Sequence, residues 1–228
     1  MPIHDATGRR RAQARAFPMM LVLACAVAGC AAGRGAADAA PPLETELREI
    51  LALLPGRYEG PAPGGRLYHK IVPIVAPQFG GDTVFYHQIS RDGFDSTVPF
   101  QQKVYVFDRA RDRAFNRMRS YVFFPKQGYA NLEQDPAALN ALQPGMLMNF
   151  PIECAIRWER GAAPGQYRAR VRREQCSYDS AAFRQRISPE LTYELARDAF
   201  AIEDILYGED GRPLFPGAGL LRAPRVSR

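Results

Sequence analysis

The fold is decided by three short runs that follow one another along the chain: RLYHKIVPIV (66–75), TVFYHQIS (83–90) and QKVYVFD (102–108). Each run is rich in Val, Ile, Tyr and Phe, a composition typical of β-strands. Paired glycines in PQFGGD (77–82) and the Gly- and Ser-containing stretch 91–99 provide the turns between them. Strands joined by such short connections usually pair antiparallel, so the segment predicts a meander that needs further strands to bury one face.

The rest of the chain supplies those strands and two short helices. Strand-like runs occur at 115–124, 154–159, 166–173, 187–195 and 200–207. The segment 43–54 has the leucine spacing of an amphipathic helix, and Asp135 followed by Pro136 is a helix start for 135–142. Because a closed barrel removes exposed sheet edges, we predict a mainly β protein: an antiparallel, calyx-shaped β-barrel with an N-terminal amphipathic helix and one short internal helix.

The first thirty residues have the three-part pattern of a bacterial export signal. Four arginines between positions 9 and 15 precede the apolar run MMLVLACAVA (19–28), and VAGC (27–30) resembles the lipobox of bacterial lipoproteins. We therefore expect Cys30 to be lipidated and the protein to be anchored to the bacterial cell envelope, at the outer membrane or the periplasmic face; the alternative is an ordinary signal peptide. This divides the chain into a lipoprotein signal peptide (1–29), a flexible tether (30–42) and a β-barrel domain (43–228).

The net charge argues against nucleic-acid binding. The chain has a formal charge of +6, but residues 1–29 contain four arginines and one aspartate, so half of that charge belongs to the expected signal. The remaining excess is too small to favour an anionic polymer. The expected partners are a membrane, through the lipid, and a hydrophobic small molecule; a homodimer is also compatible with the sequence.

Two cysteines remain in the expected mature domain beyond the lipidated one, Cys154 and Cys176. Outside the cytoplasm they are expected to form a disulfide, and a free reactive thiol is the alternative. If the loop between 154–159 and 166–173 is symmetric, Cys154 lies opposite Arg172. A bridge then requires the chain to bend after Arg172.

Motifs of common enzyme classes are absent from the sequence, which has no GxSxG, phosphate-binding glycine loop, HExxH or CxxC. His69 and His87 lie on neighbouring predicted strands, but without a third ligand nearby they form a poor zinc site, and we predict no metal. Trp158 alternates with charged residues and is expected in the core. These patterns identify no catalytic residue.

Two groups of polar strand residues are candidates for ligand binding. Arg168 and Arg170 alternate with apolar residues on one strand, and either form a solvated outer face or point into a cavity and bind a carboxylate. A set of aromatic and amide side chains either lines a site for a flat amphipathic ligand or fills a solid core. This set is Tyr86, Gln88, Phe100, Gln101, Tyr105 and Trp158.

Several motifs together resemble the CpcT/CpeT family of phycobiliprotein chromophore lyases, over about residues 43–215. They are LPGRY (54–58), YHKIVPI (68–74), VFYHQ (84–88) and VPFQQKVYVF (98–107), with a cysteine pair flanking a late hairpin. Where the family has Tyr-x-Glu-Gln, this chain has Tyr86, His87 and Gln88. The family's Pro-Tyr-Arg is here Pro99, Phe100 and Gln101, whereas Cys154 and Cys176 match the family pair.

The resemblance implies a lipocalin-like barrel that holds an open-chain tetrapyrrole, a bilin, and transfers it to a cysteine of another protein. Both the expectation of lyase activity and the expected ligand, a bilin or other tetrapyrrole, come from this resemblance. By match to the family's strands the ligand contacts are Tyr86, His87, Gln88, Gln101, Lys103 and Tyr105, to which the strand alternation adds Arg168 and Arg170. The alternative is an envelope lipoprotein with a filled barrel that acts as an interaction or structural module.

Overall fold

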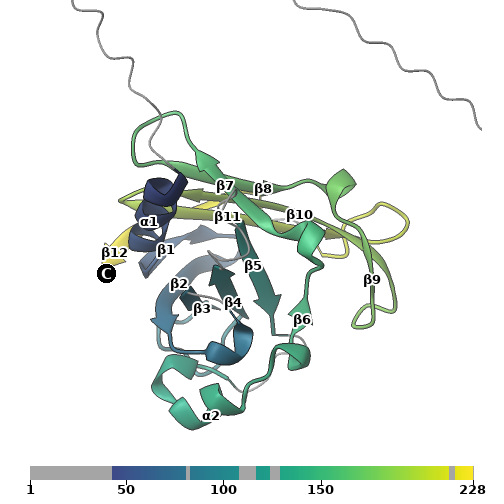
Figure 1. Cartoon of the computed structure of the whole chain (residues 1–228), viewed down its shortest axis with the longest axis horizontal. Helices are drawn as coiled ribbons and strands as arrows, with labels where there is room; N and C mark the ends of the chain where they lie inside the picture. Colours follow the sequence, from purple (N-terminus) through teal and green to yellow (C-terminus); the bar gives the residue numbers. More distant parts are fainter. Residues whose placement is uncertain (1–42, 81–82, 108–116, 124–128, 216–218, 228) are drawn as a thin grey trace, which may run out of the picture. The chain divides into compact units, whose positions relative to one another are not determined.

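The strands form one closed antiparallel barrel in the computed structural model (Figure 1), which describes residues 43–80, 83–107, 117–123, 129–215 and 219–227. The order of the ten barrel strands within these residues is β11 (Ala199–Tyr207), β12 (Leu221–Ser227), β1 (Gly56–Ala62), β2 (Gly65–Ile74), β3 (Thr83–Ser90), β4 (Gln101–Phe107), β5 (Arg117–Val122), β7 (Ile156–Arg160), β8 (Tyr167–Val171) and β10 (Gln185–Leu195). The barrel closes because β10 also pairs with β11. The predicted mainly β, antiparallel barrel is confirmed.

Two further short strands and two helices complete the described fold. Strand β6 (Met148–Asn149) pairs with β5, and β9 (Tyr178–Ser180) pairs with β10. Helix α1 (Leu43–Leu53) is the predicted N-terminal amphipathic helix. Helix α2 (Pro136–Ala141) begins as predicted, because the Asp135 side chain accepts a hydrogen bond of 2.9 Å from the Ala138 backbone N–H.

Strand alternation separates an interior from an outer surface. One hydrophobic cluster draws residues from every strand of the barrel, so it fills the interior, which we call the lumen. Its largest members include Phe85, Phe107, Trp158 and Phe200, all at most 3% exposed. Residues one position along each strand point outward. Trp158 is thus a core residue, as predicted.

Helix α1 covers one end of the lumen. Its residue Ile50, and Leu54 just after it, are fully buried among the lumen side chains. The C-terminal carbonyls of the helix are satisfied by the barrel, because the Tyr58 hydroxyl donates to Leu53 O and Leu54 O at 3.0 and 2.9 Å. The Arg225 guanidinium also donates to Leu53 O, and to Pro55 O at 2.6 Å. None of the described helices is long and apolar enough to cross a membrane.

A second core lies outside the wall formed by β2 to β5, where α2 and the segment around it cover the strands (Figure 1). Outward-facing Val84, Val104 and Val106 pack there against Leu139 and Leu142. We call this cluster the outer core. It explains why β3 and β4 are apolar on both faces, since each face is buried against a different layer.

The disulfide between Cys154 and Cys176 is formed, with the two Cα atoms 5.1 Å apart. Strand β8 ends at Val171, and the turn Arg173–Gln175 bends the chain before the second cysteine. The predicted bend is therefore present, and the bridge rather than the free thiol is confirmed.

Strands β1 and β12 were not predicted from the sequence. The β1 sequence GRYEGPA contains two glycines and a proline, which favour turns in isolation. Gly60 is required by close packing, because a Cβ there would lie 2.5 Å from the Arg222 backbone oxygen of β12. The predicted signal (1–29), Cys30, the tether (30–42), and positions 81–82, 108, 115–116, 124 and 228 lie outside the described residues.

Candidate functional site

The most polar part of the interior is a chain of titratable side chains inside the lumen. We call it the lumen network, and its members are His69, His87, Lys103, Tyr105, Tyr193 and Asp204. The first five are at most 1% exposed. Four neighbouring or facing strands of the barrel, β2, β3, β4 and β10, supply these five residues, and β11 supplies Asp204.

The network is continuous. The Nδ1 atom of His69 lies 3.1 Å from Nε2 of His87, and Nδ1 of His87 lies 2.8 Å from the Tyr105 hydroxyl. Tyr105 is hydrogen-bonded to Tyr193. Each imidazole donates through one ring nitrogen and accepts through the other when neutral, so protons can be ordered along this chain in either direction.

An ion pair ends the network. The Lys103 ammonium lies 2.5 Å from Asp204 Oδ2 and 3.5 Å from the Tyr193 hydroxyl. The Asp204 side chain is 19% exposed, so this end of the network reaches the protein surface.

Burial sets the protonation states. Burial, with a smaller effect of the Lys103 charge, lowers the pKa of His69 to about 4, so its ring is neutral at physiological pH. Burial, His69 and Lys103 together hold the pKa of His87 well below its ordinary value. Burial opposes the charge on Lys103, but Asp204 and Tyr105 together outweigh it and raise the pKa of the ammonium. Lys103 is therefore a cation, which excludes it as an amine nucleophile in this state.

Three polar atoms beside the network have no hydrogen-bond partner among the described residues: Ser120 Oγ, Trp158 Nε1 and Tyr178 Oη. Ser120 lies directly opposite Tyr105 on the neighbouring strand, and the Trp158 ring lies 6.0 Å from that of Tyr193. All three atoms are enclosed by protein. An indole N–H only donates, so Trp158 lacks an acceptor here.

The structure brings three of the predicted ligand contacts together, His87, Lys103 and Tyr105, since all three face the lumen. Gln101 is half-buried at the start of β4, on the same side of the strand as Lys103. Sequence reasoning preferred a hydrogen-bonded barrel residue to a metal ligand at His69, and did not name it as a ligand contact. Among the described residues no group of three His, Cys, Asp or Glu side chains is placed to hold a metal. Sequence reasoning missed Tyr193 and Asp204. The available signal was that Asp204 has the same strand phase as the inward Phe200 and Ile202.

Tyr86 and Gln88 are not brought into the lumen. They flank His87 on β3 and therefore point outward, into a second polar cluster. The Gln88 carbonyl accepts from the Tyr86 hydroxyl at 2.9 Å and from the Asn131 N–H at 2.8 Å. Its amide donates to the backbone of Phe94 and Ser96 at 3.2 and 3.1 Å.

Lys70 completes this outer cluster. Its ammonium lies 2.9 Å from Asp95 Oδ1, 2.5 Å from Asn131 Oδ1 and 2.7 Å from Glu133 Oε1. We call Lys70, Gln88, Asp95, Asn131 and Glu133 the clasp. These residues tie two surface segments to the wall, the one that contains Asp95 and the one that contains Asn131 and Glu133. Phe100, which follows the first of these segments, is 44% exposed and lines no enclosed site.

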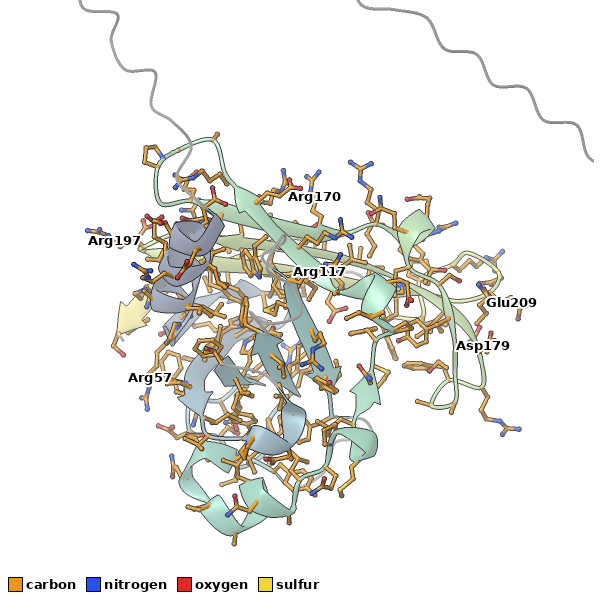
Figure 2. All side chains as sticks on the ribbon, in the orientation of Figure 1. Arg57, Arg117, Arg170, Asp179, Arg197 and Glu209 are labelled. Atoms are coloured by element: carbon orange, nitrogen blue, oxygen red, sulfur yellow. A yellow bond between two sulfur atoms is a disulfide. The ribbon has the colours of Figure 1, made fainter. Side chains whose placement is uncertain are left out.

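Arg168 and Arg170 lie on the outer face of β8, and Figure 2 shows Arg170 pointing away from the barrel. The solvated reading of this arginine row is therefore the correct one, and neither side chain enters the lumen. Arg168 Nε lies 3.5 Å from Glu194 Oε1 on the neighbouring strand.

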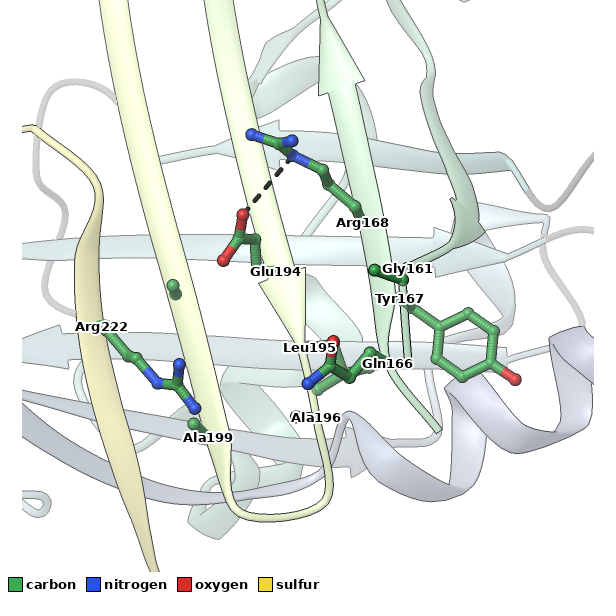
Figure 3. Close-up of a pocket in the computed structure, with 11 residues that line it drawn as sticks. Gly161, Gln166, Tyr167, Arg168, Glu194, Leu195, Ala196, Ala199 and Arg222 are labelled. Carbon is green, nitrogen blue, oxygen red and sulfur yellow. Dashed lines mark ion pairs between the residues drawn. The ribbon is translucent and has the colours of Figure 1, made fainter. Parts of the chain in front are cut away.

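Two surface pockets lie near helix α1. The larger one, of about 670 Å³, is formed by α1 and the loops that follow β7 and β10. The smaller one, of about 230 Å³, lies on the outer wall of β8, β10, β11 and β12 and is drawn in Figure 3. Gln166 and Ala196 line both pockets, so the two adjoin.

These features define a class: a closed antiparallel β-barrel with a polar network in its lumen, a fold compatible with small-molecule binding. No protein-family model matches the sequence, and no curated protein matches it. Among solved structures the chain is similar to the "SeMet CRL Protein of Arabidopsis", with a TM-score of 0.58 and 11% identity over 79% of this chain and 97% of that one. At that identity the similarity shows a shared fold.

Proposed function

We propose that the barrel binds a small amphipathic molecule in its lumen. The observation that supports this is the lumen network itself. Hydrocarbon would fill a purely structural barrel at least as stably, because a buried ion pair is often no more stabilising than apolar residues of the same volume. Clusters of buried residues with perturbed pKa values are also more frequent at functional sites than elsewhere.

The chemistry of the lumen favours a flat ligand that carries acceptor oxygens. An ammonium has three protons, and Lys103 has two acceptors among the described residues, one of them at 3.5 Å. With the Trp158 N–H, this leaves donors that suit a carboxylate or carbonyl oxygen. The rings of Tyr105, Tyr193 and Phe200 suit a conjugated body.

A bilin carries both features, which supports the proposal that this is a barrel of the CpcT/CpeT type. The residue types fit carboxylate and lactam groups. The Trp158 N–H is enclosed in this state, so entry of a molecule of that size requires the barrel to open, and we propose that α1 moves away from the end of the lumen that it covers. Lyase-type transfer to a protein cysteine is the activity that the resemblance implies, and we propose it as a second step after binding.

Titration of the purified protein with biliverdin tests the binding step. We expect the visible absorption of the pigment to shift, and Lys103→Met to weaken binding. Arg170→Gln, an exposed change on the outer wall, is the control and should leave the affinity unchanged. An unaltered pigment spectrum at high protein excess would count against a lumen site. Colour that stays with an acceptor protein after denaturation would support transfer.

The second candidate function is an interaction or structural module with a filled barrel. The observation that favours it is the packing of the lumen, where Phe85, Phe107 and Phe200 are at most 2% exposed. In that case biliverdin leaves the spectrum unchanged, and replacing the Lys103–Asp204 pair with Met and Leu leaves the protein folded and its partners bound.

We further propose that Cys30 is lipidated and holds the barrel at the bacterial cell envelope. The support is the VAGC motif after an apolar run. Cys30→Ala should move the protein from the membrane pellet to the soluble fraction of a cell lysate. An unchanged distribution would favour an ordinary signal peptide.

A further inference from the structure

The two pockets beside α1 adjoin at Gln166 and Ala196, and we call them together the α1 groove. Its larger part lies between Leu53 of the helix and the loop at Pro164 and Gly165. Its smaller part runs over the outer wall from Ala196 to Arg222. The larger part alone, at about 670 Å³, is within the size range of sites for drug-sized ligands, roughly 300–1,000 Å³.

Strand register explains the shape of the smaller part. A row of directly opposite residues crosses the outer wall from β12 to β8: Arg222, Ala201, Glu194 and Arg168. Ala201 is the one small side chain in this row, and Ala199, two residues before it, lies on the same face of β11. Two alanines among longer side chains leave the depression.

The charges along this row are unequal. Arg168 is paired with Glu194 at 3.5 Å, as the dashed line in Figure 3 shows. Arg222 reaches over the pocket from the opposite side in the same view. No ion pair or hydrogen bond of the Arg222 side chain is formed within the described residues. The smaller part therefore has one cation in excess.

The larger part is mostly apolar and close to balanced in charge. Ala52, Leu53 and Pro164 provide its apolar walls. Its acidic residue Glu49 is already engaged, since its carboxylate accepts a hydrogen bond from Tyr167 and lies 3.9 Å from Arg160. Arg197 and Asp198 are adjacent at its rim and offset each other.

We propose that the α1 groove is a second binding site, outside the lumen, for a small molecule with an apolar body and one anionic group. The apolar body occupies the pocket between α1 and Pro164, and the anionic group, a carboxylate or sulfonate, binds Arg222. The guanidinium suits such groups because it donates two parallel N–H bonds to two oxygens. This site needs no movement of α1, and it does not depend on any ligand in the lumen.

The matched dyes anilinonaphthalene sulfonate and N-phenylnaphthylamine test this site in the full-length protein. They share the apolar rings, but only the first carries an anionic group. We expect fluorescence enhancement with both dyes and tighter binding of the sulfonate. Arg222→Gln should weaken the sulfonate by about two- to five-fold, the range for an exposed charge pair, and leave the neutral dye unchanged.

Two variants fill the junction of the pockets. Ala196 is half-exposed and Gln166 is exposed, so Ala196→Leu and Gln166→Trp are both compatible with the fold. Each substitution should reduce binding of both dyes. Arg170→Gln removes an equal charge from the same wall outside the groove, and should have no effect. Lys103→Met, inside the lumen, reports separately on any dye that binds there.

Three results would overturn the proposal. If Arg170→Gln weakens the sulfonate as much as Arg222→Gln does, the attraction is general surface charge. If the sulfonate and the neutral dye respond alike to Arg222→Gln, the anion does not bind there. If Lys103→Met abolishes binding while both filling variants leave it intact, the dyes occupy the lumen, which would support the lumen site and remove the groove.

Discussion

The protein buries two lysines at the same β2–β4 wall, and they are satisfied to different degrees. Lys70, in the clasp outside the wall, has three acceptors at 2.5 to 2.9 Å, one for each ammonium proton. Lys103, in the lumen, has one carboxylate at 2.5 Å and a hydroxyl at 3.5 Å. Both side chains are at most 2% exposed, so burial alone does not separate them.

This difference distinguishes polar groups that are bonded within the protein from polar groups that could still bond a ligand. The clasp uses its buried amide fully, since Gln88 bonds through both its oxygen and its nitrogen. The lumen network lies beside Ser120 and Trp158, whose polar atoms have no partner in the described part of the chain. Glu133 Oε2 of the clasp also lacks a partner among the described residues, so the difference lies in the two ammonium groups. Lys70 is fully satisfied and fixes a conformation, whereas Lys103 and the unpaired atoms beside it cost stability until another molecule completes them.

The largest expected effect comes from removing the lumen carboxylate. Asp204→Ala leaves the Lys103 ammonium buried without its counter-charge, so we expect the free energy of unfolding to fall by about 3–5 kcal/mol. Asp95→Ala in the clasp is the matched control. Asp95 is half-exposed and Lys70 keeps Glu133 and Asn131, so the loss should be about 0–1 kcal/mol. Urea unfolding of both variants measures the difference, and equal losses would remove the distinction between the two lysines.

The next effect is a dependence of stability on pH that separates the two regions. The pKa of His69 is lowered to about 4 in the folded protein, so between pH 6.5 and 4 the unfolded chain binds protons that the folded chain does not. His69 alone should lower the free energy of unfolding by about 3 kcal/mol as the pH falls through this window, and the lowered pKa of His87 adds to that loss.

The clasp should respond only at lower pH. The hydrogen bond from Lys70, with the Lys70 and Arg57 charges, lowers the pKa of Asp95 below its ordinary value, so its contribution is lost only in more acidic solution. Urea unfolding at pH 7, 5.5 and 4 checks the order. Replacing both lumen histidines with Phe should flatten the curve above pH 4. A wild-type curve that is already flat there would show that the pair is not buried in its neutral form.

Gln88→Ala should have a smaller effect. It removes an amide that holds two surface segments to β3 and leaves buried partners such as the Asn131 N–H unbonded. One buried group left unsatisfied costs about 1–3 kcal/mol, so we expect a loss near 2 kcal/mol. Gln78→Ala is the control. It removes a half-buried amide that donates to Leu139 O and Leu142 O at the C-terminal end of α2, and so does not involve the clasp. Proteolysis within 91–100 should accelerate in Gln88→Ala alone.

Sequence reasoning predicted the barrel because several of its strands are recognisable from their own residues. The β2–β4 meander and the β7–β8 hairpin are rich in β-branched and aromatic residues and are separated by turns. Strands β1 and β12 have no such signal. They are strands because each has a partner on both sides, and pairing of this kind is decided by the tertiary fold.

The candidate site was only partly predictable for a related reason. Alternation along β3 and β4 predicts which residues share a face, but not which face is the lumen, because both faces are buried. The match to the family's strands predicted ligand contacts at the inward His87, Lys103 and Tyr105. It predicted contacts at the outward Tyr86 and Gln88 as well. Tyr193 and Asp204 join the network only because the closed barrel brings β10 and β11, which lie far along the chain, to face β4 across the lumen.

The smallest expected effect has the opposite sign. The Ser120 hydroxyl is enclosed beside Tyr105 without a hydrogen-bond partner among the described residues, so it destabilises the folded state. Ser120→Ala removes that cost and should raise the free energy of unfolding by up to about 1 kcal/mol, where the clasp variant loses stability. If the hydroxyl is kept for a lumen ligand, the same change should weaken biliverdin binding. Urea unfolding and pigment titration of one variant measure both. A loss of stability in Ser120→Ala would instead mean that an internal water already bonds the Ser120 hydroxyl, and would favour the filled barrel.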